Sequence, residues 1–130
     1  MHRENVNYNF KVLLVDDEEE FVTTLSERLE LRGIQTRIAS DGQNALRLFE
    51  ADLPHVVVLD VMMPGIGGLE VLQQIKAINS KVPVILLTGH GSKKEGVEGK
   101  RLGAFDYLMK PLNIEDLIKR MLEALGTEKE

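Results

Sequence analysis

The chain has 130 residues, a formal net charge of −5 at pH 7 and no cysteine. This length predicts one domain with an ordinary apolar core, and the lack of cysteine excludes disulfides, thiolate metal sites and cysteine nucleophiles. The acidic balance argues against direct binding of nucleic acid, and every apolar run is far shorter than the ~20 residues of a membrane-spanning helix. Because the polar start also lacks the apolar centre of a signal peptide, we expect a cytoplasmic protein that does not bind membranes.

Strands and helices alternate in the first half of the chain. The expected order is a strand over 10–15, a helix over 18–32, an alternating strand over 34–39, a short helix capped by Asp41 and ended before Pro54, and an apolar strand over 55–60. The first helix has Phe21, Leu25 and Leu29 at helical spacing, with Val22 beside them, which predicts one apolar face. In the alternating strand, Ile34 and Ile38 are expected on one face, as in a strand near a sheet edge.

The alternation continues to the end of the chain. The expected order is a helix over 68–78, an apolar strand over 82–88, a poor helix capped by Ser92 that reaches about Leu102, an alternating strand over 104–110, and a helix capped by Asn113 that reaches Leu125. We therefore expect a domain over residues 10–126, between a flexible segment at 1–9 and a tail at 127–130.

Five strands alternating with five helices predict an α/β fold with right-handed crossovers and a parallel sheet. The three most apolar strands should be central and the two alternating strands should lie at the edges. This arrangement corresponds to the doubly wound, flavodoxin-like order 2-1-3-4-5. Ligands of such folds bind outside the carboxyl ends of the strands.

Polar residues follow four of the predicted strands: Asp16-Asp17-Glu18, Asp60, Thr88-Gly89 and Lys110-Pro111. In a parallel sheet these strand ends meet at one edge, so three carboxylates should converge beside a hydroxyl and an ammonium group. Crowded carboxylates repel one another and need a counter-charge. Lys110 supplies part of that charge, and Mg²⁺, which prefers oxygen ligands, fits the rest.

The sequence around these residues, from Lys11 to about Leu125, resembles the receiver domain of two-component response regulators. The motifs that carry the resemblance are VLLVDDE (12–18), VLDVMMPGIGG (58–68), VILLTGHG (84–91) and LGAFDYLMKP (102–111). The resemblance implies that Asp60 is the phosphoacceptor. It implies that Mg²⁺ is bound directly by Asp17, mainly through water by Asp16, and also by Asp60 and the backbone carbonyl of Met62. Thr88 and Lys110 would contact the phosphoryl oxygens, Thr88 and Tyr107 would form the switch, and the bond before Pro111 would be cis.

The implied function is that of a phosphorylation-activated signalling switch. A sensor histidine kinase, a phosphotransfer protein or a small acyl phosphate would supply the phosphoryl group, and the domain would also hydrolyse its own aspartyl phosphate. The face formed by the fourth helix, fifth strand and fifth helix would then contact an effector domain or protein, or a second copy of the chain. The motif wording is similar to that of receivers attached to transcriptional activators.

Several residues lie outside these implied roles. Three methionines, Met62, Met63 and Met109, are expected to fill the core. Gly96 and Gly99 are poor helix formers, each costing about 1 kcal/mol against alanine, which predicts an unusually mobile fourth helix. Four cations in the same segment, Lys93, Lys94, Lys100 and Arg101, favour an acidic partner surface. His90 is interpreted as a loop histidine.

Three other functions are open to a chain of this kind. A pseudo-receiver would use the fold for interaction without phosphorylation, although all five polar site residues are present. An Mg²⁺-dependent phosphohydrolase needs a second acid two residues after its aspartate nucleophile, where Met62 stands. A flavodoxin-like electron carrier would need a phosphate-binding loop where Asp16-Asp17-Glu18 would repel the phosphate.

Overall fold

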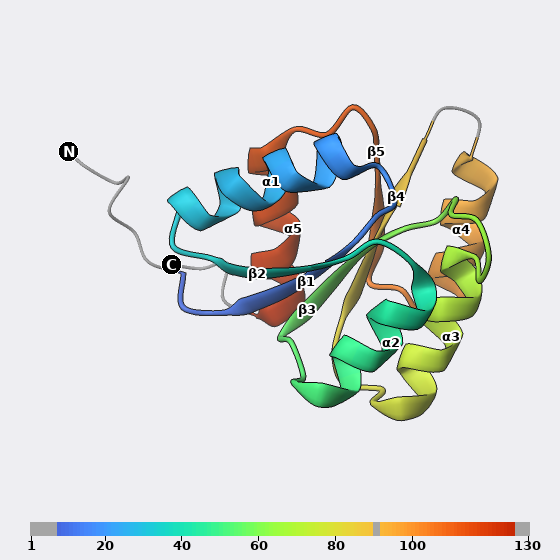
Figure 1. Cartoon of the computed structure of the whole chain (residues 1–130). Coiled ribbons are helices and arrows are strands. Elements are labelled where there is room, and N and C mark those ends of the chain that lie inside the picture. The colour runs from blue at the N-terminus through green and yellow to red at the C-terminus, as the bar shows by residue number, and fades with distance from the viewer. Residues whose placement is uncertain (1–7, 90–91, 127–130) are drawn as a thin grey trace.

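The computed structural model describes residues 8–89 and 92–126, so the expected flexible start and the tail lie largely outside the described residues. The elements in chain order are β1 (Lys11–Val15), α1 (Glu19–Leu31), β2 (Gln35–Ala39), α2 (Gly42–Ala51), β3 (Val56–Asp60), α3 (Gly68–Ile78), β4 (Val84–Thr88), α4 (Lys93–Arg101), β5 (Asp106–Met109) and α5 (Ile114–Leu125) (Figure 1). The predicted alternation of strands and helices is confirmed.

One parallel sheet holds all five strands in the order β2-β1-β3-β4-β5, as predicted. Every residue of β3 and β4 is buried, whereas β2 and β5 are only partly covered. Continuous apolar strands therefore occupy the centre, where helices cover both faces, and the two alternating strands lie at the edges.

Helices cover both faces of the sheet (Figure 1). On one face, α1 and α5 bury their apolar sides against alternate strand residues, through Val22, Leu29 and Met121 among others. On the other face lie α2, α3 and α4, with Phe49 and Leu72 fully buried beneath them. No helix in the described part of the chain is long and apolar enough to span a membrane.

Capping residues set several helix boundaries. The side chain of Asp41 accepts a hydrogen bond from the Asn44 N–H at the start of α2, and Asn113 accepts from two N–H groups at the start of α5. These two predicted caps are confirmed. Ser92 precedes α4 as expected, but its hydroxyl makes no cap and donates instead to the Gly89 carbonyl at 2.8 Å.

Some expectations about burial are wrong. Of the three methionines expected in the core, Met63 is buried, but Met62 is 58% exposed in the loop after β3 and Met109 is 44% exposed at the end of edge strand β5. Phe21 lies on the apolar face of α1 as expected, where it is half-buried against the core and beside Lys110.

Candidate functional site

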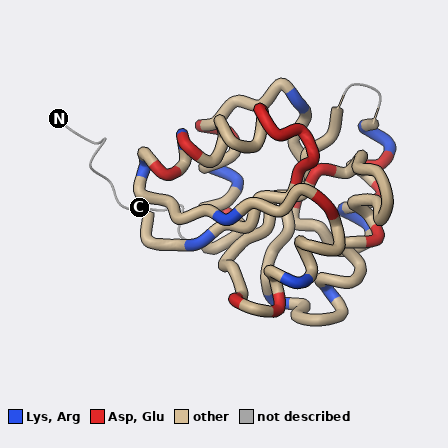
Figure 2. The backbone as a smooth tube through the Cα atoms, in the orientation of Figure 1, with Lys and Arg blue, Asp and Glu red and all other residues tan. Residues whose placement is uncertain are grey.

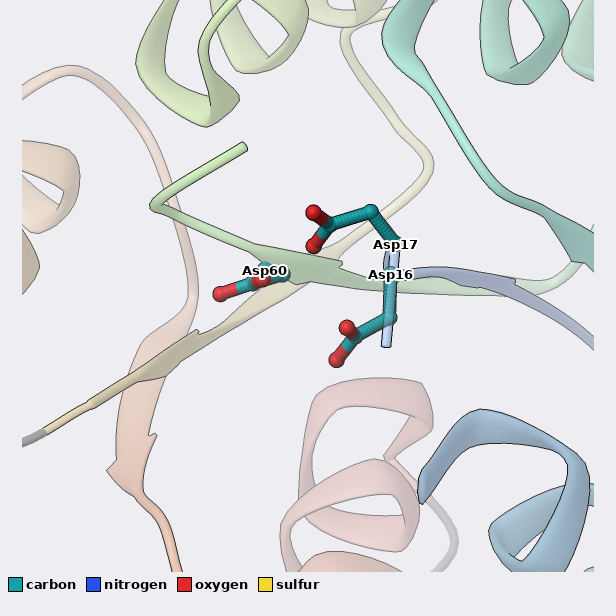
Figure 3. A group of neighbouring side chains, drawn as sticks. All are labelled: Asp16, Asp17 and Asp60. Carbon is teal, nitrogen blue, oxygen red and sulfur yellow. The ribbon is translucent and has the colours of Figure 1, made fainter. Parts of the chain in front are cut away.

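Three aspartates meet at the carboxyl ends of β1 and β3. These strands are paired, with Val15 opposite Leu59, so Asp16 and Asp60 follow in adjacent positions. One carboxylate oxygen from each of Asp16, Asp17 and Asp60 lies within 4.8 Å of the others, and Figure 3 shows the three side chains around one point. Acidic residues are also concentrated along the loop from β1 into α1 (Figure 2).

Burial sets the electrostatics of this cluster. Asp16 is 2% exposed and Asp60 5% exposed, whereas Asp17 faces solvent. Burial, reinforced by the charge of Asp16, raises the pKa of Asp60 from 3.8 to about 6, against the opposing effects of Lys110 and the Met62 N–H. The ionised form of Asp60 is therefore held in a site that disfavours it, and a bound cation would relieve this cost.

The donor set fits a hard divalent cation. Asp16 Oδ1 accepts a hydrogen bond from the Glu18 N–H at 2.9 Å. The second oxygen, Asp16 Oδ2, is buried and lies 2.9 Å from Lys110 Nζ, a single contact that leaves a lone pair free. A buried carboxylate oxygen with unused acceptor capacity, beside two more carboxylates, is the arrangement that Mg²⁺ and its waters satisfy.

Lys110 is the cation of the cluster, but its ammonium group lies nearer to other acids than to Asp60. Lys110 Nζ is 2.6 Å from Glu18 Oε1, 2.9 Å from Asp16 Oδ2 and 3.9 Å from Asp60 Oδ2. It also lies 4.4 Å from the centre of the Phe21 ring. Burial would lower the pKa of Lys110, but the contacts with Glu18 and Asp16 and the charge of Asp60 outweigh it and raise the pKa.

Thr88 and Tyr107 lie on neighbouring strands beside this cluster. Thr88, fully buried at the end of β4, directs its hydroxyl to the Leu108 carbonyl at 3.5 Å, a long hydrogen bond. Tyr107 is half-buried and packs against the apolar residues under α2, α3 and α4. The peptide bond between Lys110 and Pro111 is cis.

Gly96 lies directly against both Thr88 and Tyr107. A β-carbon added to Gly96 would lie 2.7 Å from Tyr107 Cγ and 3.0 Å from Thr88 Cγ2. One at Gly99 would lie 2.0 Å from Leu86 Cδ1. Both glycines therefore allow α4 to approach the sheet closely. This packing role was not anticipated from the sequence, where the glycines are only poor helix formers.

Ion pairs join the elements of the expected output face. Asp106 on β5 lies 3.7 Å from Lys100 Nζ on α4 and 2.8 Å from Arg120 Nε on α5. These contacts connect two helices across the edge of the sheet. His90 lies outside the described residues.

Glu18, Phe21 and Gly68 make contacts at this site that were not predicted from the sequence. Glu18 and Phe21 contact Lys110 from the start of α1. Gly68 begins α3 against the Asp60 main chain, where an added β-carbon would lie 2.4 Å from the Asp60 carbonyl oxygen. For Glu18, the only available signal was its position directly after the aspartate pair.

Comparison with known proteins gives a consistent result. The family model of the response regulator receiver domain matches residues 12–122. The response regulator MprA of Mycolicibacterium vanbaalenii is 41% identical over 85% of this chain and 48% of its own length. The regulatory protein AtoC of Escherichia coli is 36% identical over 92% of the chain and 27% of its own length. The chain thus spans about half or less of these relatives.

Solved structures resemble the whole fold. A receiver domain protein from Clostridium thermocellum superposes with a TM-score of 0.86 at 34% identity, covering 92% of this chain and 97% of that one. The receiver domain of NtrX from Brucella abortus gives a TM-score of 0.85 at 34% identity, covering 90% and 99% respectively.

Proposed function

Because this chain belongs to the response regulator receiver domain family of two-component systems, we propose that it is a phosphorylation switch with Asp60 as its phosphoacceptor. The observation that carries the proposal is the convergence of Asp16, Asp17 and Asp60 at one point, with Lys110 beside them. Buried carboxylates with one strongly raised pKa, a cation and a hydroxyl at the edge of a sheet are typical of a functional site.

The proposed reaction transfers a phosphoryl group to the Asp60 carboxylate. Asp60 Oδ attacks the phosphorus of a phosphohistidine on a sensor histidine kinase or phosphotransfer protein, or of a small acyl phosphate. The new O–P bond forms as the P–N or P–O bond of the donor breaks, and the imidazole or carboxylate leaves with the bonding electrons. Attack by water on the same phosphorus later restores the carboxylate and releases inorganic phosphate.

The chain's own residues supply positioning and charge, which dominate the catalysis of phosphoryl transfer. Asp16, Asp17, Asp60 and the backbone carbonyl of Met62 would hold Mg²⁺, which when bound neutralises charge on the carboxylates and the phosphoryl oxygens. Lys110 Nζ and the Thr88 hydroxyl would contact the remaining phosphoryl oxygens. The hydrogen bond from the Thr88 hydroxyl to the Leu108 carbonyl is long and therefore weak, so a phosphoryl oxygen can replace it.

Thr88 would couple phosphorylation of Asp60 to a change in Tyr107. Movement of its side chain towards a phosphoryl group on Asp60 would open space beside Tyr107, since a β-carbon at Gly96 would meet both residues. An inward rotation of Tyr107 would then change the face formed by α4, β5 and α5. A local charge change of this kind biases an element with two conformations.

The proposed partners, met in the cytoplasm, are a sensor histidine kinase or phosphotransfer protein and an effector. The relatives MprA and AtoC are longer than this chain and are named as regulators, which supports control of a downstream output such as transcription. The effector, or a second copy of the chain, would bind the face formed by α4, β5 and α5, and contact with nucleic acid would be left to the effector.

The deciding experiment is incubation with acetyl phosphate and Mg²⁺ followed by intact mass measurement. We expect one phosphoryl adduct on the wild-type protein and none on Asp60→Asn or in EDTA. An adduct that survives Asp60→Asn would place the acceptor elsewhere. If the wild-type protein binds Mg²⁺ but forms no adduct with acetyl phosphate or with a phosphorylated histidine phosphotransfer domain, the chain is a pseudo-receiver.

A further inference from the structure

The ammonium group of Lys110 lies nearer to Glu18 and Asp16 than to the proposed phosphoacceptor Asp60. We infer that Glu18, assisted by Phe21, holds the Lys110 ammonium group away from Asp60 in the unphosphorylated protein and thereby slows phosphoryl transfer. Glu18 is thus a positioning residue that acts through Lys110. This inference rests on the proposed function, because Lys110 must reach a phosphoryl oxygen on Asp60 for its position to matter.

The distances place the ammonium group of Lys110 nearer to Glu18 than to Asp60. Lys110 Nζ donates a hydrogen bond to Glu18 Oε1 at 2.6 Å but lies 3.9 Å from the nearer Asp60 oxygen. The Phe21 ring, 4.4 Å away, stabilises the positive charge on the Glu18 side. Two groups from the start of α1, together with Asp16, therefore hold Lys110 in its observed position.

The Glu18 side chain has no other role at the helix terminus. Glu18 occupies the N-cap position of α1, where a carboxylate commonly accepts hydrogen bonds from the first N–H groups of a helix. Its side chain makes no such cap. The carboxylate extends to Lys110 instead, so the Lys110 contact accounts for its orientation.

Because the Glu18 side chain is exposed, another anion can replace it as the partner of Lys110. The Glu18 side chain is 61% exposed, whereas the Asp16 side chain on the other side of Lys110 is 2% exposed. An exposed ion pair is weak because water and salt screen it, so a phosphoryl group on Asp60 can displace Glu18 as the partner of Lys110. The buried Asp16 is the other acid in contact with Lys110, at 2.9 Å, and its contact does not depend on Glu18.

Loss of the Glu18 charge should therefore favour the position near Asp60. We expect Glu18→Gln to accept phosphate from acetyl phosphate about two- to fivefold faster than the wild-type protein at saturating Mg²⁺. The matched control is Glu19→Gln, which removes an equal charge from the adjacent exposed residue in the first turn of α1. This control should leave the rate unchanged.

The position of Lys110 can be measured directly by NMR without phosphorylation. In the wild-type protein, the Phe21 ring current should shift the Lys110 ε-methylene protons upfield. Glu18→Gln should reduce that shift, and Glu19→Gln should preserve it. Phe21→Leu should remove the shift and also raise the phosphorylation rate, which separates the hold on Lys110 from simple repulsion of an anionic donor.

Equal acceleration by both glutamine variants would overturn the inference, because it would show a general charge effect. An unchanged Lys110 shift in Glu18→Gln would also overturn it. If no variant accepts phosphate but the Lys110 shift still responds to Glu18→Gln alone, the hold on Lys110 is supported and the proposed function fails. The two ideas can thus be rejected separately.

Discussion

Gly68 packs on the main chain of Asp60, with no room for a side chain between them. A β-carbon at Gly68 would lie 2.4 Å from the Asp60 carbonyl oxygen and 2.6 Å from Val61 Cα. The Gly68 N–H also donates to the Val61 carbonyl at 3.0 Å. The start of α3 is therefore fixed against the strand end that carries the proposed phosphoacceptor.

Gly68→Ala should destabilise the fold severely, because backbone atoms cannot move aside as a flexible side chain can. We expect a loss of about 3 kcal/mol or more in the free energy of unfolding, measured by urea denaturation. Gly67→Ala is the matched control, since an added β-carbon there has nothing within 4 Å, and should cost less than about 1 kcal/mol. Equal losses in the two variants would show that the close approach is not what requires glycine.

Asp60→Asn should stabilise the metal-free protein at neutral pH. The pKa of Asp60 is about 6 in the fold against 3.8 ordinarily, so the ionised side chain destabilises the folded state. This penalty is absent below about pH 4, grows between about pH 4 and 6, and is complete above about pH 6. The variant should therefore gain up to about 3 kcal/mol at pH 7.5 and almost nothing at pH 3.5.

Urea denaturation in EDTA across this pH range provides the measurement for Asp60→Asn. Saturating Mg²⁺ should reduce the difference in free energy of unfolding between Asp60→Asn and the wild-type protein at pH 7.5. The reason is that a cation beside Asp60 removes the cost of its ionised form in the wild-type protein. A stability difference independent of pH would contradict the assigned electrostatics of the site.

Gly96→Ala tests whether α4 needs its glycines for packing or for mobility. Alanine would improve helix propensity by about 1 kcal/mol, but its β-carbon would overlap Tyr107 Cγ, which cannot swing away as the end of a flexible side chain can. We therefore expect a net loss of about 1–2 kcal/mol and a changed chemical environment for Tyr107 by NMR. Lys94→Ala, at an exposed position of the same helix, is the control.

The mobility hypothesis makes the opposite prediction for Gly96→Ala. If the glycines serve mainly to loosen α4, the variant should gain stability and slow hydrogen exchange in that helix. A gain in stability with unchanged Tyr107 signals would reject the packing role described above.

The fold was predictable because its signals are local. Continuous apolar runs such as VVVLD and VILLT need cover on both faces, and helix-period segments between them supply it. The convergence of Asp16, Asp17 and Asp60 followed from the same topology, because the carboxyl ends of parallel strands share one edge of a sheet.

The missed features depend on contacts between distant parts of the chain. Glu18 and Lys110 are 92 positions apart, and the sequence does not say which of several nearby acids a lysine will contact. Met62 and Met109 are apolar, but hydrophobicity alone does not tell a core position from a loop or a strand end. Gly96 carries no local sign of the Tyr107 ring packed against it.

Because of Asp106, the face formed by α4, β5 and α5 should respond to the salt concentration. Lys100 and Arg120 reach this one carboxylate from α4 and α5, so surface charges help to tie two helices on opposite faces of the sheet. Screening acts over about 8 Å at physiological ionic strength and over shorter distances in more concentrated salt. Salt therefore weakens the longer, more exposed Lys100 contact more than the Arg120 contact. A partner that spans both helices meets a firmer surface in dilute buffer than in concentrated salt.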